Sequence, residues 1–512
     1  MEDVTQWMVT TVPIEHLETR TGQDAEGPDG PDGPDGPDAG DTNDPLDPTQ
    51  GDSSESGSDS PGPDNQDLPP PLPPDIGRST PPPTYEQCMK TAVPLSFMDF
   101  WPQCVEPEHQ EFIFSRFETF DLLIQEANKW LQEQKDIIVR NCETVEIKVS
   151  SLDEYILFTT AKASVYKNRF RQALYVKGLR IWYSSQIINK LPCIYAKTPC
   201  TLDYVNIVPS LVGEENSEYE KFPALVEKCN EMMKQGTISG RLLNVETVTM
   251  KIPDMDEVGK NNIHIDPNRT AWLDYYDKFG CQVLRAYFLP EQPTAEVLHY
   301  ADFCADCTRR SKHSPRFEDF EGIMDNCRLW LLQLSPESHI LNSQTVEAQY
   351  RGKPKNNRRL YNPDICLYTD YEALPRIRFL RIYYVIPEGP APPDDDYLAP
   401  LLSHKTFVPA VLKRRHHESL ATLMQRVERW LRVTGATVVC AETLPILEHV
   451  WHDRSTADMS VFRSEYEDGG TQFDQEPLLY VVRVYLDTVY PEPPNYVLNG
   501  GSPEDDEDCI IL

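Results

Sequence analysis

The most regular feature of the chain is a helical pattern of apolar residues that occurs four times. In each of four segments, apolar side chains recur at spacings of three and four residues, which places them on one face of a helix. Each segment therefore predicts an amphipathic helix that buries one side. The four faces consist of Phe117, Phe120, Leu123, Ile124, Ala127, Trp130 and Leu131; Phe222, Leu225, Val226, Cys229, Met232 and Met233; Phe317, Phe320, Ile323, Met324, Cys327, Trp330 and Leu331; and Leu420, Leu423, Met424, Val427, Trp430 and Leu431.

Three landmark residues accompany each of these segments at nearly constant spacing. Bulky anchors near the end of each segment lie 102, 98 and 100 residues apart. A threonine follows each anchor by 13–15 residues, and an arginine follows that threonine by 36–40 residues. Three landmarks that keep their register four times indicate tandem duplication of a unit of about 100 residues. The anchors are Trp130, Met232, Trp330 and Trp430; the threonines are Thr144, Thr247, Thr345 and Thr443; the arginines are Arg180, Arg285, Arg381 and Arg483.

Alternating apolar residues follow each threonine and surround each arginine, which is the pattern of β-strands. Val145, Ile147 and Val149 show this alternation after the first threonine. The strand that carries each arginine closes its unit, and about 35 residues between the two strands leave room for a further strand or hairpin. The sequence therefore predicts an α+β fold of four tandem units, each with one amphipathic helix on a small antiparallel sheet.

Composition separates this repeated region from the two ends of the chain. Residues 1–90 hold 20 Asp and Glu, three Lys and Arg, and 17 of the 45 prolines, which is the composition of a disordered arm. An acidic run from Glu504 to Asp508 marks a second disordered segment. The predicted organisation is an acidic arm at 1–92, repeat units at 93–190, 200–292, 300–392 and 400–490, and a tail at 491–512.

The net charge of −34 argues against nucleic acid as a partner, because phosphates need a positive surface. No apolar run is long enough for a transmembrane helix, and the first residues do not resemble a secretory signal. The 13 cysteines are scattered and odd in number, as in reduced thiols, so we expect a cytoplasmic protein. Cys304 and Cys307 with His313 form only half of a zinc-like cluster, so we expect no metal and no cofactor.

An aromatic residue stands two positions after each landmark arginine, on the same face of its strand. The pairs could form a repeated ligand face by cation–π contacts. Alternatively, each arginine pairs with a carboxylate of its own unit, such as Glu143, Glu246 or Glu442, although Gln344 takes that place in the third unit. The four pairs are Arg180 and Trp182, Arg285 and Tyr287, Arg381 and Tyr383, and Arg483 and Tyr485.

Two PPxY motifs flank the repeated region and resemble the ligands of WW domains. Such ligands present proline rings in polyproline II geometry, and the tyrosine fills a second pocket. A proline-rich stretch at 68–74 is a possible site for WW, SH3 or EVH1 domains. The motif residues are Pro82, Pro83 and Tyr85 in the arm, and Pro493, Pro494 and Tyr496 in the tail.

The last four residues, Cys509-Ile510-Ile511-Leu512, fit a C-a-a-X box whose final leucine is typical of geranylgeranylation. A protein prenyltransferase would alkylate the Cys509 thiol, and removal of the last three residues with methylation of the new carboxylate would follow. The five preceding acidic residues would weaken attachment to an anionic membrane, so we expect exchangeable peripheral residence. The same terminus also fits a PDZ-type ligand.

No catalytic motif is present among the hydrolase, metalloprotease and nucleotide-binding signatures, so we expect a protein that is not an enzyme. The sequence predicts a prenylated peripheral-membrane adaptor that recruits WW-domain proteins through its two PPxY motifs, and HECT-type ubiquitin ligases are one class of such proteins. The alternative is a protein that binds a lipid or small molecule on its arginine–aromatic faces, with the tail serving only localisation.

Overall fold

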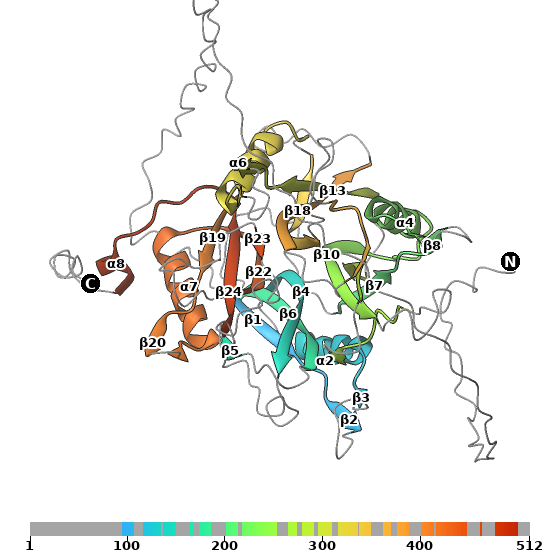
Figure 1. Cartoon of the computed structure of the whole chain (residues 1–512), viewed down its shortest axis with the longest axis horizontal. Coiled ribbons are helices and arrows are strands. Elements are labelled where there is room, and N and C mark those ends of the chain that lie inside the picture. The colour runs from blue at the N-terminus through green and yellow to red at the C-terminus, as the bar shows by residue number, and fades with distance from the viewer. Residues whose placement is uncertain are drawn as a thin grey trace, which may run out of the picture. The chain divides into compact units, whose positions relative to one another are not determined.

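A computed structural model describes most of residues 95–499 (Figure 1). Contacts between Cα atoms divide the chain into two units, Met1–Arg78 and Ser79–Leu512, and every described residue belongs to the second unit. The described ranges are 95–106, 116–134, 137–149, 164–166, 174–185, 201–212, 218–252, 265–273, 279–290, 295–309, 316–335, 337–349, 362–369, 376–388, 401–413, 416–447, 461–462 and 477–499.

The four predicted amphipathic helices are α2 (Phe120–Glu133), α4 (Phe222–Lys234), α6 (Phe320–Leu331) and α7 (Leu420–Thr434). Their apolar stripes are buried as the periodicity predicts, except that the anchors Trp130, Met232 and Trp330 are half-buried, as is Met233, and α8 (Asn495–Asn499) adds one short turn near the end. Capping fixes several of the helix ends. Asp319 and Ser419 accept a hydrogen bond from the third residue of α6 and α7, and Gly435 ends α7 in the left-handed region at φ 66°.

The prediction that Phe117 and Phe317 belong to the helices that follow them was wrong. Both residues lie in short hairpin strands, β3 (Arg116–Phe117) and β15 (Arg316–Phe317). The helices begin three residues later, because Thr119 and Asp319 have the extended backbone of N-cap residues. An apolar residue just before an N-cap continues the helical spacing without belonging to the helix.

Four antiparallel sheets accompany the four helices, so the fold is α+β, as predicted. In each sheet an arginine-bearing strand lies between an outer strand and a threonine-bearing strand. The sheets are sheet 1, with β1 (Leu95–Phe100), β6 (Leu174–Ser185) and β4 (Ile137–Val149); sheet 2, with β7 (Asp203–Ile207), β12 (Phe279–Leu289) and β10 (Arg241–Ile252); sheet 3, with β13 (Glu296–Cys304), β18 (Arg376–Pro387) and β16 (His339–Gln349); and sheet 4, with β19 (Ser403–Phe407), β24 (Pro477–Leu486) and β22 (Val438–Leu447).

A fourth strand in each sheet comes from the segment between the two long strands of a neighbouring sheet. The strands β11 (Ala271–Leu273), β17 (Leu367–Thr369) and β23 (Val461–Phe462) pair with β6, β12 and β18. The strand β5 (Ser164–Tyr166) pairs with β24, so a segment near the start of the chain completes the sheet nearest its end. The threonine-bearing strands also contact one another in the order β4, β10, β16, β22 and back to β4, which closes the cycle.

Four hairpins connect the outer strands to the helices. They are β2 (Cys104–Glu106) with β3, β8 (Leu211–Val212) with β9 (Glu218–Tyr219), β14 (Cys307–Arg309) with β15, and β20 (Val411–Lys413) with β21 (His416–His417). The core lies between each helix and two sheets. For example, the buried face of α7 packs with Phe407 and Val484 of its own sheet and with Leu95 and Trp182 of sheet 1.

No helix within the described ranges is long and apolar enough to cross a membrane.

Candidate functional site

The four arginine–aromatic pairs lie in the interior. Each arginine is at most 2% exposed, and each aromatic partner is fully buried. Both faces of the arginine-bearing strands are covered, because the helix lies over one face and the neighbouring sheet approaches the other. The arginine–aromatic pairs, which the sequence suggested as a ligand face, are therefore covered by other parts of the protein.

Each arginine donates a hydrogen bond to the landmark threonine of the neighbouring sheet. The Nη1 atoms of Arg285, Arg381 and Arg483 lie 2.8, 3.1 and 2.8 Å from the Oγ1 atoms of three threonines. Arg180 makes the same bond at 2.5 Å across the closure of the cycle. These side chains join one sheet to the next, and the four pairs are Arg285 with Thr144, Arg381 with Thr247, Arg483 with Thr345, and Arg180 with Thr443.

The residue before each threonine repeats this link. Glu246, Gln344 and Glu442 each accept a hydrogen bond from the backbone N–H of the landmark threonine in the preceding sheet. The three threonines are Thr144, Thr247 and Thr345, at 2.9, 2.7 and 2.7 Å. Glu143 accepts the equivalent bond from Thr443 at 2.6 Å. Gln344 also donates its Nε2 to the Thr247 carbonyl, 3.0 Å away, so an amide serves where the other three positions have a carboxylate.

A third layer of bonds comes from the start of each threonine-bearing strand. Asn141 and Asn342 donate to the carbonyls of Ala441 and Val245, at 2.8 and 2.9 Å. Asn244 donates in the same way to Cys142, and the Ser343 N–H lies 3.2 Å from the Cys440 sulfur. We call these three layers, together with the landmark threonines, the junction network. The first layer consists of the arginines, the second of Glu or Gln, and the third of Asn or Cys.

The arginine charges are compensated differently from one junction to the next. Arg180 and Arg381 each make a bidentate ion pair, with Asp99 at 2.6 and 2.7 Å and with Asp302 at 2.7 and 2.8 Å. Arg285 instead donates to Asn206. The predicted alternative, a carboxylate of the arginine's own unit, therefore holds for three of the four arginines: Asp99 pairs with Arg180, Asp302 with Arg381, and Glu442 lies 3.6 Å from Arg483. Two of these carboxylates are aspartates of the outer strands and not the glutamates given as examples.

Each guanidinium also lies over an aromatic ring. Arg285, Arg381 and Arg483 lie 3.6, 3.5 and 3.7 Å from the ring centres of the first phenylalanine of α2, α4 and α6. The helix α7 begins with Leu420, and Arg180 lies over Phe97 at 4.0 Å instead. These desolvated cation–π contacts attach the starts of α2, α4 and α6 to the next sheet, whereas the contact of Arg180 with Phe97 stays within sheet 1.

Burial also changes the protonation of the junction carboxylates. It raises the pKa of Glu143 to about 8, against the opposing effects of Arg180 and of the bonds from Thr443 and Trp182. Burial likewise raises the pKa of Glu246 and lowers that of Lys177 to about 7. Perturbed groups often mark catalytic sites, but here Glu143 and Glu246 are bonded to Thr, Trp and Tyr side chains or backbone of the body itself.

The C-terminal PPxY motif lies on the surface beside α7. Pro493 is half-buried, and Pro494 and Asn495 are exposed. Tyr496 lies in α8, whose next residues pack on α7: the Leu498 carbonyl accepts a bond from Arg429 at 3.1 Å, and the Leu498 side chain packs against the core under α7. The predicted disorder of the tail does not extend to residues 491–499, because this short helix docks on the body.

The other predicted binding residues lie outside the described ranges. These are Pro82, Pro83 and Tyr85 of the first PPxY motif and Cys509 of the C-terminal box. Within the described ranges, no group of three or more His, Cys, Asp or Glu could hold a metal ion.

Sequence analysis missed the junction network although it found most of its members. The sequence does contain a sign of this network: the landmark threonines and arginines recur at the same spacing, and each arginine bonds to the threonine of the neighbouring sheet. No known protein family, curated protein or solved structure matches the chain.

Proposed function

We propose that this chain is a prenylated peripheral-membrane adaptor that recruits WW-domain proteins through its two PPxY motifs. Its body is a closed cycle of four tandem repeat units, each contributing one helix and one sheet. The equivalent junction bonds between neighbouring sheets support four copies of one unit. Motifs on segments that flank a packed body support a binding role for those segments.

One observation carries the adaptor proposal: the two motif-bearing segments join the body at the same core. Leu95, which follows the first motif by ten residues, and Leu498, which follows the second by two, both pack into the cluster beneath α7. Ten residues span at most about 35 Å, so both motifs stay within reach of one partner with two WW domains. Bivalent capture of this kind raises avidity by about 10²–10⁴ when both sites bind together.

The C-terminal box supplies the membrane part of the proposal. A single lipid on Cys509 would give reversible attachment, and the acidic residues before it disfavour strongly anionic surfaces. Ligand binding on the arginine–aromatic faces is not proposed as a second function, because those side chains are buried and bonded within the junction network.

WW capture is tested with Tyr85→Ala, Tyr496→Ala and the double variant of the full chain. Binding to an immobilised tandem-WW protein is measured, and Tyr397→Ala, which changes a tyrosine outside both motifs, serves as the control. Each single change should weaken binding roughly tenfold or more, and the double change should abolish it. Capture of the double variant at wild-type strength would refute the adaptor proposal.

Lipid attachment is tested by the intact mass of the C-terminal peptide from cells. A geranylgeranyl adduct on Cys509, with the last three residues removed, and loss of membrane association in Cys509→Ser would support the proposal. An unmodified carboxylate on Leu512 would refute the lipid anchor and favour the PDZ-type ligand.

A further inference from the structure

One of the four equivalent sheet–helix segments differs from the others in charge. The segment from β19 through α7, residues 403–434, contains seven Lys and Arg and two Glu, a net charge of +5. The equivalent segments at 95–133, 203–234 and 296–331 have net charges of −6, −4 and −2. Because the four segments build the same elements, the fold does not require this positive charge.

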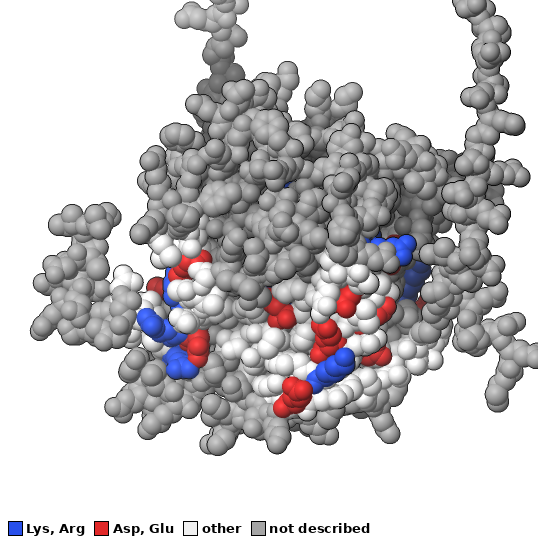
Figure 2. Space-filling view, turned by 90° about the horizontal axis from the view of Figure 1, so that it is seen from below, with Lys and Arg blue, Asp and Glu red and all other residues white. Residues whose placement is uncertain are grey.

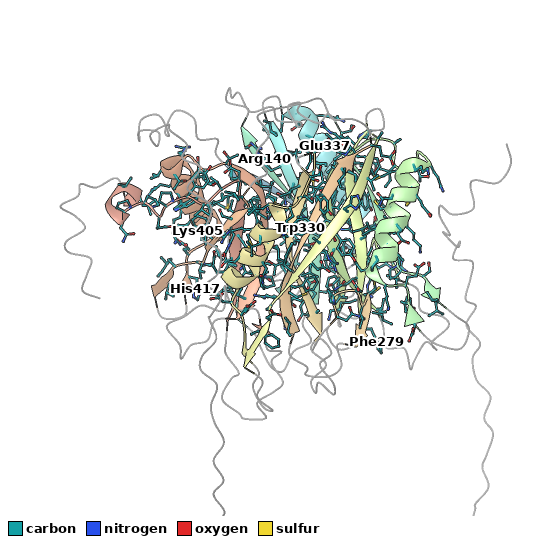
Figure 3. All side chains as sticks on the ribbon, turned by 90° about the horizontal axis from the view of Figure 1, so that it is seen from above. Arg140, Phe279, Trp330, Glu337, Lys405 and His417 are labelled. Carbon is teal, nitrogen blue, oxygen red and sulfur yellow. The ribbon has the colours of Figure 1, made fainter. Side chains whose placement is uncertain are left out.

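The described cations of this segment are accessible on α7 and beside it. Arg426 and Arg432 are 45% and 47% exposed, Lys405 is 33% exposed, and Arg429 is also exposed. Arg426 forms an ion pair with Glu418 and Arg432 with Glu428, so the acidic run would share these two arginines with carboxylates of the same segment. Arg426, Arg429 and Arg432 lie three residues apart on one side of α7, and we call these four residues the α7 basic surface. Figure 3 places Lys405 on the ribbon of this part of the chain, and Figure 2 shows Lys and Arg side chains beside Asp and Glu side chains at several places on the face seen from below.

The tail already follows this surface. Tyr490 packs into the core beneath α7, and Glu492 forms an ion pair with Lys405 at 2.5 Å. Arg429 then donates to the Leu498 carbonyl. Among the described residues, Arg429 forms no ion pair with a carboxylate.

The charge of the tail changes sharply just beyond the described residues. Five consecutive acidic residues, Glu504–Asp508, begin five residues after the end of α8. Five residues span at most about 18 Å, and the three arginines of α7 cover about 9 Å along the helix. The acidic run can therefore reach every arginine of the surface, and its tether gives it an effective concentration of order 1 mM.

We propose that the acidic run Glu504–Asp508 docks on the α7 basic surface as an intramolecular ligand. The docked run would continue the contacts that Glu492 and Leu498 begin. It would hold Pro493–Tyr496 and the Cys509 segment against the body, so that a WW domain or a prenyltransferase competes with the docked tail. This consequence for partner access rests on the proposed function, whereas the docking itself does not.

Photocrosslinking in the full, unmodified chain tests the docking without lipid or WW protein. Asp506 is replaced by p-benzoylphenylalanine, which keeps four of the five acidic residues, and the crosslinked peptides are mapped by mass spectrometry. In about 50 mM NaCl, the crosslinks should fall on residues 405–434. The variant Arg426→Gln, Arg429→Gln, Arg432→Gln should reduce their yield roughly tenfold, as should about 0.5 M NaCl, where the screening length falls to about 4 Å.

A matched control removes three positive charges from α4, with Lys221→Gln, Lys228→Gln and Lys234→Gln, and should leave the yield unchanged. Circular dichroism of both triple variants verifies that they fold. Crosslinks spread over other helices, or a yield unaffected by the α7 variant, would overturn the proposal. If instead the α7 surface carries binding of the unmodified chain to phosphatidylserine vesicles and no crosslink forms, the surface is a membrane contact and the docking is refuted.

Failure of the docking and failure of the proposed function give different results. Absence of WW capture or of the lipid would leave the crosslink in place. Absence of the crosslink would leave the two tyrosine motifs and Cys509 to be judged by their own experiments.

Discussion

The variant Glu143→Gln tests how the buried junction network is charged. Glu143 accepts hydrogen bonds from the Thr443 N–H at 2.6 Å and from the Trp182 Nε1 at 2.9 Å. Burial raises its pKa from 4.5 to about 8, although Arg180 acts in the opposite direction. Gln344 occupies the equivalent position in sheet 3 and bonds to its neighbouring threonine, so an amide can accept the Thr443 N–H. The amide NH2 of a glutamine at position 143 would face the Trp182 Nε1–H donor, a cost that does not change with pH.

The direction of the expected pH dependence follows from the raised pKa. Between pH 4.5 and about 8, the folded chain keeps the Glu143 proton while the unfolded chain has lost it. The unfolded state therefore binds fewer protons, and the contribution of Glu143 to stability falls as pH rises, by up to about 1.4 kcal/mol per pH unit. Glutamine has no such proton, so Glu143→Gln should gain stability relative to wild type across this interval.

Urea unfolding of both proteins at about pH 5, 6.5 and 8 measures the difference in unfolding free energy. The difference should be smallest at the lowest pH and should change in favour of the variant by about 1–3 kcal/mol over the series. The reciprocal variant Gln344→Glu places a carboxyl in the equivalent buried position and should acquire a downward slope of its own. A difference that stays constant from pH 5 to 8 would show that Glu143 is already ionised in the fold, with Arg180 outweighing burial.

Two further predictions concern packing at the junctions and at a close backbone contact. Arg381→Lys loses the bidentate geometry with Asp302 and should lower the free energy of unfolding in urea by about 1.5–3 kcal/mol. Arg432→Lys, in an exposed ion pair, is the control and should lower it by less than about 0.5 kcal/mol. Equal losses would contradict the structural role of the buried pair. Gly240→Ala would bring a methyl group into the backbone carbonyl of Leu289 and should lower the free energy of unfolding by about 1–3 kcal/mol. The loss should exceed that of Gly178→Ala, whose methyl group meets the Trp101 side chain. Thermal unfolding compares the two variants, and a smaller loss for Gly240→Ala would contradict the prediction.

Helical periodicity was informative because it depends on residues three and four positions apart. The stripe from Phe120 to Leu131 is buried as predicted, since one helix face needs only one partner surface. Helix starts were less predictable at Phe117 and Phe317, where an apolar residue outside the N-cap continues the same spacing. Periodicity identifies a face but does not determine where the backbone turns.

The outer strands were not predicted, because their pairing partners are distant in sequence. The strand β7 is five residues long, has a mixed pattern and bonds to β12 about 80 residues later. The role of the arginines was missed for a related reason. Residues i and i+2 share a strand face, as Arg285 and Tyr287 do, but the sequence of one unit does not reveal that a neighbouring sheet covers that face.

Closure of the cycle explains why both ends of the chain leave the body together. The bond between Asn141 and Ala441 joins residues 300 positions apart, whereas the equivalent bonds of the other junctions join residues about 100 apart. An open row of the four sheets and their helices would expose the apolar face of α7 at one end and Leu95 with Trp182 at the other, and open arrays need capping elements for such surfaces.

In the closed cycle these two surfaces cover each other, and β5 pairs with Pro477–Leu479 of β24, a stretch of this central strand that β19 does not cover. The chain must then enter and leave next to the same junction, where Leu95 and Leu498 share one core. The proximity of the two motif-bearing segments therefore follows from the way the fold buries its ends. The junction between sheets 4 and 1 is the one at which the chain does not pass directly from one sheet to the next. Any partner that binds both segments would bridge this junction.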